Sequence, residues 1–146
     1  MTQKDKELLL RDLCARLPYN VICQVEFKED GKYNSKDMLL SGIFTDEAYF
    51  TTKGGSVYSN EYKPYLFPMS SMTDDQCCDF YCRFVENEID YNDFKKYYFD
   101  GCLWHKVLTS INDCGDIIDW FNKNHFDYRG LIEKGLAIDA TGLNIY

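Results

Sequence analysis

The sequence predicts an α+β fold of one domain: an N-terminal helix, a small antiparallel sheet, and a C-terminal group of three to four helices. Three observations carry this prediction. A stripe of leucines opens the chain, short alternating segments punctuated by glycine follow it, and apolar residues recur at helical spacing after residue 72. The helix-first order also allows a closed sheet of the SH3-like or Sm-like barrel type. We therefore divide the single domain 1–146 into a helix-plus-sheet half (1–62), a connector (63–72) and an acidic helical half (73–146).

The first half begins with a helix over about residues 3–16. Thr2 is a suitable N-cap, Pro18 ends the run, and one stripe carries Leu9, Leu10, Leu13, Cys14 and Leu17. Residues 21–27 then alternate as a half-exposed strand does, and Glu29-Asp30-Gly31-Lys32 supplies a turn. We expect further strands at about 38–44, 48–52 and 56–59, with Gly54-Gly55 as a hairpin turn.

The connector and the second half follow different patterns. Two prolines make Lys63-Pro-Tyr-Leu-Phe-Pro68 extended rather than helical. Thr73 and Gln76 form a capping box, which starts a helix whose apolar stripe is Cys77, Phe80, Tyr81, Phe84 and Val85. Residues 90–100 are aromatic and partly helical. Further helical stripes contain Trp104, Val107, Leu108 and Ile111, and then Ile117, Trp120 and Phe121, before a last turn that Asp127 caps and Gly135 ends. We expect these helices to cover the sheet.

Charge and composition exclude several classes of function. The chain carries a net charge of −8, with 9 basic and 10 acidic side chains in residues 1–72 but 7 basic and 14 acidic in residues 73–146. Nucleic-acid binding is therefore disfavoured, because it depends on clustered Lys and Arg. No apolar stretch approaches the roughly 20 residues of a membrane span. The N-terminus lacks the pattern of a secretory signal, and the seven cysteines are typical of free thiols, so we expect a cytoplasmic protein.

Three segments resemble an uncharacterised family of small proteins from anaerobic gut bacteria and their phages. They are Lys6-Glu-Leu-Leu-Leu-Arg-Asp-Leu-Cys-Ala-Arg-Leu-Pro-Tyr19, Lys63-Pro-Tyr-Leu-Phe-Pro-Met-Ser-Ser-Met-Thr73 and the stretch from His125-Phe-Asp-Tyr-Arg-Gly to Asp139. The resemblance covers about a third of the chain and implies no activity or site residue. Where the family pattern has Gly after Tyr19, this chain has Asn20, which also tolerates the left-handed conformation of a turn.

Several candidate sites have simpler structural explanations. A zinc site can be drawn from Cys78, Cys82, Cys102 and His105, but it lacks a tight Cys-x2-Cys pair, so we assign no metal or other cofactor. The oxygen ligands at Glu86, Glu88, Asp90 and Asn92 lack the glycine and the bidentate Glu of a calcium loop. His125 is expected to form a local hydrogen bond with Asp127 rather than to act in catalysis.

The favoured hypothesis is a non-catalytic protein that binds a protein partner through the acidic, aromatic face of its second half. An inhibitor or nucleic-acid mimic, associated with phage, is one version of it. The candidate interaction surface consists of Asp74, Asp75, Asp79, Glu86, Glu88, Asp90, Tyr91, Asp93, Tyr97 and Tyr98. The alternative is a small enzyme or a nucleotide- or metabolite-sensing domain with a pocket between sheet and helices. RNA binding by an Sm-like sheet is disfavoured by charge. The sequence leaves the partner and the oligomeric state open.

Overall fold

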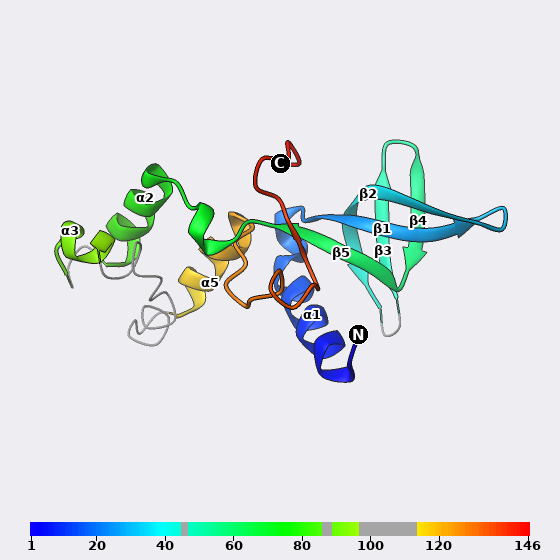
Figure 1. Cartoon of the computed structure of the whole chain (residues 1–146), viewed down its shortest axis with the longest axis horizontal. Helices are drawn as coiled ribbons and strands as arrows, with labels where there is room; N and C mark the ends of the chain where they lie inside the picture. Colours follow the sequence, from blue (N-terminus) through cyan, green and yellow to red (C-terminus); the bar gives the residue numbers. More distant parts are fainter. Residues whose placement is uncertain (45–46, 86–88, 97–113) are drawn as a thin grey trace.

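The computed structural model describes residues 1–44, 47–85, 89–96 and 114–146 of the chain, and their arrangement confirms the mixed α+β fold. Figure 1 shows the sheet at one end of an elongated molecule and the helices α2 (Asp74–Phe84) and α3 (Tyr91–Phe94) at the other. Helix α1 (Gln3–Arg16) and the C-terminal segment lie between the two ends. The connection between the halves is therefore built from both ends of the chain.

Helix α1 forms as the sequence predicts. Thr2 is its N-cap, with the Thr2 hydroxyl accepting from the Asp5 amide at 3.2 Å while the Asp5 carboxylate accepts from the Thr2 amide at 3.0 Å. A 3-10 turn (Leu17–Tyr19) follows, and Asn20 ends it with φ 56°, in the left-handed conformation that the sequence suggested for this position. Leu9 and Leu13 are buried against the sheet.

The described residues form a sheet of six strands in the order β4-β3-β2-β1-β5-β6, in which every neighbouring pair is antiparallel except β5 and β6. Asp30 and Gly31, both with positive φ, form the predicted turn between β1 and β2. A bulge between Leu40 and Gly42 lets β2 bend, and Figure 1 shows β3 and β4 crossing β1 and β5 steeply. The strands are β1 (Ile22–Glu29), β2 (Lys32–Ile43), β3 (Ala48–Thr52), β4 (Gly55–Ser59), β5 (Glu61–Leu66) and β6 (Ile138–Asp139).

The first four residues of the predicted connector, 63–66, are extended as expected and belong to a strand. β5 pairs with β1 over Cys23–Glu26, with Pro64 opposite Cys23, and so returns the fifth strand to the side of the first. Pro64 is tolerated because, among the described strands, only β1 pairs with β5 at this position, so one side of the backbone needs no donor. The Ser59 hydroxyl donates to the Glu26 carbonyl at 2.6 Å and closes the corner between β4 and β1.

The buried apolar side chains of the described residues form two separate clusters. The sheet is packed by α1 and by Leu131, Leu136 and Ala137, whereas the described helices of the second half pack on one another. The prediction that the helices cover the sheet is therefore wrong for α2, α3 and α5, because their apolar and mostly aromatic stripes pack on one another, but the predicted last turn does pack on the sheet through Leu131. The predicted stripe from Trp104 to Ile111 lies outside the described residues. The helical cluster contains Met72, Cys77, Phe80, Val85, Phe94, Ile117, Trp120, Phe121 and Phe126. Within the described ranges, no helix has both the length and the apolar character that crossing a bilayer requires.

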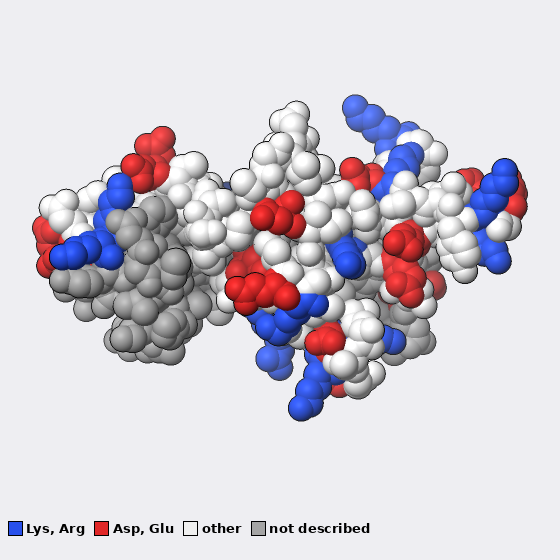
Figure 2. Space-filling model, in the orientation of Figure 1, with Lys and Arg blue, Asp and Glu red and all other residues white. Residues whose placement is uncertain are grey.

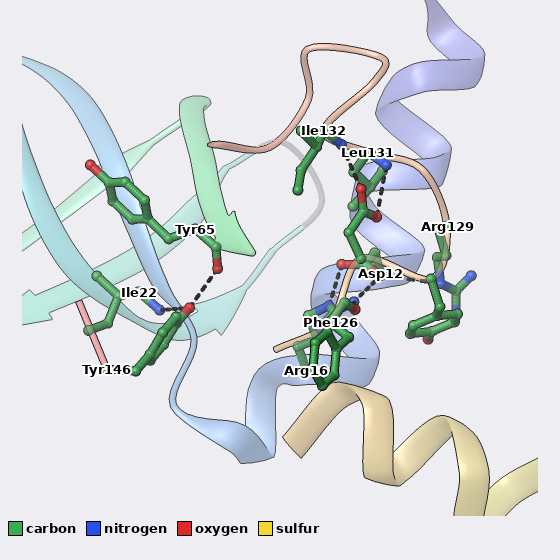
Figure 3. A network of polar contacts seen from close by, with 11 residues as sticks. Asp12, Arg16, Ile22, Tyr65, Phe126, Arg129, Leu131, Ile132 and Tyr146 are labelled. Carbon is green, nitrogen blue, oxygen red and sulfur yellow. Dashed lines mark hydrogen bonds and ion pairs between the residues drawn. The ribbon is translucent and has the colours of Figure 1, made fainter. Parts of the chain in front are cut away.

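A buried network of charges joins the two halves (Figure 3). Asp12 and Arg16 on α1, both with fully buried side chains, form an ion pair at 2.6 Å, and Arg129 approaches the second oxygen of Asp12 at 3.2 Å. Arg16 also donates to the Phe126 carbonyl at 2.7 Å. The Tyr128 ring lies within cation–π range of both guanidinium groups, at 5.4 and 4.9 Å. Helix α1 and the segment after α5 (Cys114–Lys123) are thereby held in one arrangement.

His125 and Tyr146 extend this junction toward the sheet. Their rings stack at a centroid distance of 3.7 Å, and the Tyr146 hydroxyl donates to the Tyr65 carbonyl at 2.7 Å. The hydrogen bond expected between His125 and Asp127 is not formed, because the Asp127 carboxylate accepts instead from the amides of Leu131 and Ile132. Burial, followed by the nearby Arg16 charge, lowers the pKa of His125 to about 4.

Stability should therefore depend on pH through His125. Between about pH 6.5 and pH 4, His125 binds a proton in the unfolded chain but not in the folded chain. The free energy of unfolding is therefore unaffected by His125 above pH 6.5 and decreases as the pH falls from 6.5 toward 4. Urea unfolding of wild type and His125→Asn checks this, since Asn tolerates the φ of 58° at this position. We expect the wild type to lose more stability than the variant on acidification; parallel pH curves would contradict the assignment.

Candidate functional site

Helix α2 presents the first carboxylates of the predicted interaction surface. Thr73 and Gln76 form the predicted capping box, with bonds of 3.2 and 2.9 Å, and this sets Asp74 and Asp75 on the exposed first turn. Carboxylates at this end are favoured by the helix dipole. Asp74 forms an ion pair with Lys95 at 2.9 Å, so its charge is already partly balanced. Asp75 is exposed.

Asp79 lies on the side of α2 that faces α5. Its carboxylate accepts from the indole Nε1 of Trp120 at 2.8 Å and from Arg83 at 2.8 Å. These two hydrogen bonds, with that from Trp120 contributing most, hold the pKa of Asp79 below its usual value. Asp79 therefore stays ionised at neutral pH and links the two helices.

A cleft of about 500 Å³ opens between α2, α5 and the turn after α1. Asp116 and Asp119 line it from α5, where they project one turn apart from the polar side of the helix. Asp119 lies near Tyr19, and partial burial, followed by the negative charge of this carboxylate, raises the pKa of Tyr19. The lining consists of Tyr19, Asp79, Arg83, Phe84, Asp116, Asp119, Trp120, Lys123 and Asn124. Three carboxylates thus face two cations among aromatic side chains.

The remaining described members of the predicted surface lie around α3. Asp90 is its N-cap and accepts from the Asn92 amide at 2.8 Å, while Asp93 is exposed. Tyr91 packs edge-on against Tyr81 at 5.0 Å and is half-buried. Four members of the predicted surface lie outside the described residues: Glu86, Glu88, Tyr97 and Tyr98.

The structure therefore divides the predicted surface. Asp74 and Lys95 join the beginning of α2 to the end of α3, whereas Asp79 belongs to the cleft on the α5 side. Sequence reasoning missed Asp116 and Asp119, although both fall on the polar side of the stripe formed by Ile117, Trp120 and Phe121. It also missed Tyr19, which only the fold brings beside α5.

The structure describes two of the four residues of the hypothetical zinc site. Cys78 and Cys82 are exposed on α2, and Cys102 and His105 lie outside the described residues. In the described part of the chain, no group of three or more His, Cys, Asp or Glu side chains is arranged to hold a metal ion. Cys77 is buried in the helical core as its position in the stripe predicts, and burial raises the pKa of its thiol to about 11.

A larger hollow, of about 700 Å³, lies between α1, β1, β5 and residues 134–138. It is the place where the alternative hypothesis would put a small ligand. Its polar lining includes both signs of charge, from Asp5, Glu26, Glu61, Lys63 and Lys134. The described lining contains neither histidine nor cysteine, so a nucleophile or base of those types would have to come from elsewhere.

Comparisons with known proteins found no match to this chain. No family model, no curated protein and no solved structure matches it.

Proposed function

We propose that this protein is a non-catalytic binding protein whose helical half takes a basic segment of a protein partner into the cleft between α2 and α5. The observation that carries the proposal is the cleft itself, where Asp79, Asp116 and Asp119 are set around aromatic side chains. A lysine or arginine side chain suits this lining, since its charge pairs with the carboxylates and its stem packs on aromatic rings. The surrounding acidic excess of the second half would speed the encounter.

The charge distribution favours a local site over an extended acidic field. Figure 2 shows one face of the molecule, on which acidic and basic side chains are interspersed. The residues drawn in colour include no continuous acidic row on this face. A nucleic-acid mimic would need such a row to occupy a basic groove. A cleft that accepts one or two basic side chains needs only the carboxylates that line it.

Charge reversal in the cleft tests the proposal. Asp79 and Asp90 are poor choices, because the first holds Trp120 and the second caps α3. Asp116→Lys with Asp119→Lys is better, since both side chains are exposed. After the partner has been identified by affinity capture from the native cell, we expect this double variant to bind it on the order of 30-fold more weakly or worse.

The matched control is Glu7→Lys with Glu29→Lys, which changes the net charge by the same amount on the sheet half. This control should bind the partner as the wild type does, apart from a modest change in association rate. The double variant Asp75→Lys with Asp93→Lys changes the α3 side of the predicted surface and leaves the carboxylates of the cleft in place. Comparing its binding with that of the cleft variant shows which of the two surfaces the partner uses. Equal loss in the control and in the cleft variant, or no loss in the cleft variant, would overturn the proposal.

A further inference from the structure

Strand β4 forms an open edge of the sheet. The strand order places β3 on one side of it and no described strand on the other. Its five residues, Gly-Ser-Val-Tyr-Ser, include neither charge nor proline, which are the usual features that keep an edge strand from pairing. Tyr58 in this strand is 55% exposed, and its ring contacts those of Tyr49 and the equally exposed Phe44. This edge is thus uncharged, and it is accessible at Ser56 and Tyr58, although Ser59 at its end is buried beside β1.

The register of the β3–β4 hairpin defines which backbone groups of β4 are available. Thr52 and Gly55 close the two-residue turn, so they form a hydrogen-bonded pair, and the pairs alternate from there. Val57 therefore bonds to Phe50, while the N–H and C=O groups of Ser56 and Tyr58 point away from β3. No backbone hydrogen bond of the described residues outside the regular elements uses these groups. Two donors and two acceptors are left on one side of β4.

We propose that β4 pairs antiparallel with β4 of a second copy of this chain, around a twofold axis at Val57. In this register Ser56 lies opposite Tyr58 of the second copy and Tyr58 opposite its Ser56, so all four outward groups form hydrogen bonds. The two Tyr58 rings lie on the same face as a diagonal pair, a spacing that aromatic side chains bridge. A continuous sheet through both copies results.

The charges beside β4 suit a second copy. Lys53 precedes β4 in the β3–β4 turn and Glu61 follows it at the start of β5, so each copy brings one basic and one acidic residue beside this strand. The sheet half also carries only one net negative charge, counting 9 basic and 10 acidic side chains in residues 1–72. Two copies of a chain with net charge −8 can meet here with little repulsion, which the acidic second half would not permit.

Sedimentation or light scattering tests the pairing through the mass of the particle. The wild type should approach twice the 17.2 kDa of one chain as its concentration rises. Ser56→Pro removes an outward N–H and leaves the bonds to β3 in place, so it should keep the secondary structure and melting temperature but self-associate at least about tenfold more weakly. A wild type that stays at 17.2 kDa at every concentration would overturn the proposal.

Cross-linking tests the register. Opposite residues of a non-hydrogen-bonded pair have Cα atoms about 4.5 Å apart, within the range of a disulfide. Val57→Cys should therefore form a disulfide-linked dimer under mild oxidation far faster than the wild type with its native cysteines. The control is Tyr33→Cys, because Tyr33 is 81% exposed at the tip of the β1–β2 hairpin and offers a more accessible thiol. If the chain dimerises but Val57→Cys forms the disulfide no faster than Tyr33→Cys, the dimer uses another surface, and the pairing of β4 is refuted.

Discussion

Replacing Asp12 by alanine is expected to lower the free energy of unfolding by about 3–5 kcal/mol. Asp12 is fully buried and is the carboxylate that balances Arg16 and Arg129. Its removal leaves two guanidinium groups in the junction between the halves without their counterion. Breaking a buried pair costs more than the pair contributes, since the remaining charge has lost its solvent as well as its partner. Urea unfolding, followed by circular dichroism, measures the loss.

The exposed ion pair of α2 supplies the control for Asp12. Arg83 pairs with Asp79 at 2.8 Å with the same spacing of four residues, but its side chain is 60% exposed. Arg83→Ala should therefore change stability by no more than about 1 kcal/mol. A loss in Asp12→Ala as small as that in Arg83→Ala would show that the junction is not held by this network.

Replacing Phe80 by alanine should remove about 3–5 kcal/mol from the helical half through the cavity it creates. The Phe80 ring is fully buried and lies 5.1 to 6.1 Å from the rings of Phe84, Phe94, Trp120 and Phe121. Because the sheet has an apolar cluster of its own, amides of β1 and β2 should keep their protection when those of α2 and α5 lose it. Hydrogen exchange measures both sets in one experiment.

Phe80→Leu is the conservative control, and it should lose clearly less stability because less volume is removed. Equal loss of protection in β1 and α2 would show that the two clusters unfold as one cooperative unit. The sheet and the helical half would then share one cooperative core.

Local signals explain which parts of the fold could be predicted. The capping residues Thr2 and Thr73, the alternation in β1 and the Asp30-Gly31 turn are all readable within a few residues, and each forms as expected. β5 was missed because Pro64 within it and Pro68 just after it resemble the prolines of a linker, and only pairing with β1 makes it a strand. β6 has two residues and forms by contact with a strand 73 positions earlier.

The site was less predictable than the fold, since its contacts are remote in sequence. Asp79 was selected for its charge, but its bond to Trp120 joins residues 41 positions apart. The sequence did not single out Asp12, because a carboxylate beside Leu13 is typical of a solvated helix face. Its partner Arg129 lies near the other end of the chain. A single sequence shows which residues carry charge. It does not show which of them the fold buries or brings to one cleft.

Photo-cross-linking from the cleft tests the central claim most directly. A photoreactive amino acid at Lys123, which lines the cleft, leaves the three carboxylates intact, and the same group at Lys28 on the β1–β2 hairpin is the exposed control. We expect the partner to be linked from position 123, through a segment containing lysine or arginine, and not from position 28. Linking from position 28 alone, or equally from both positions, would contradict a binding site between α2 and α5.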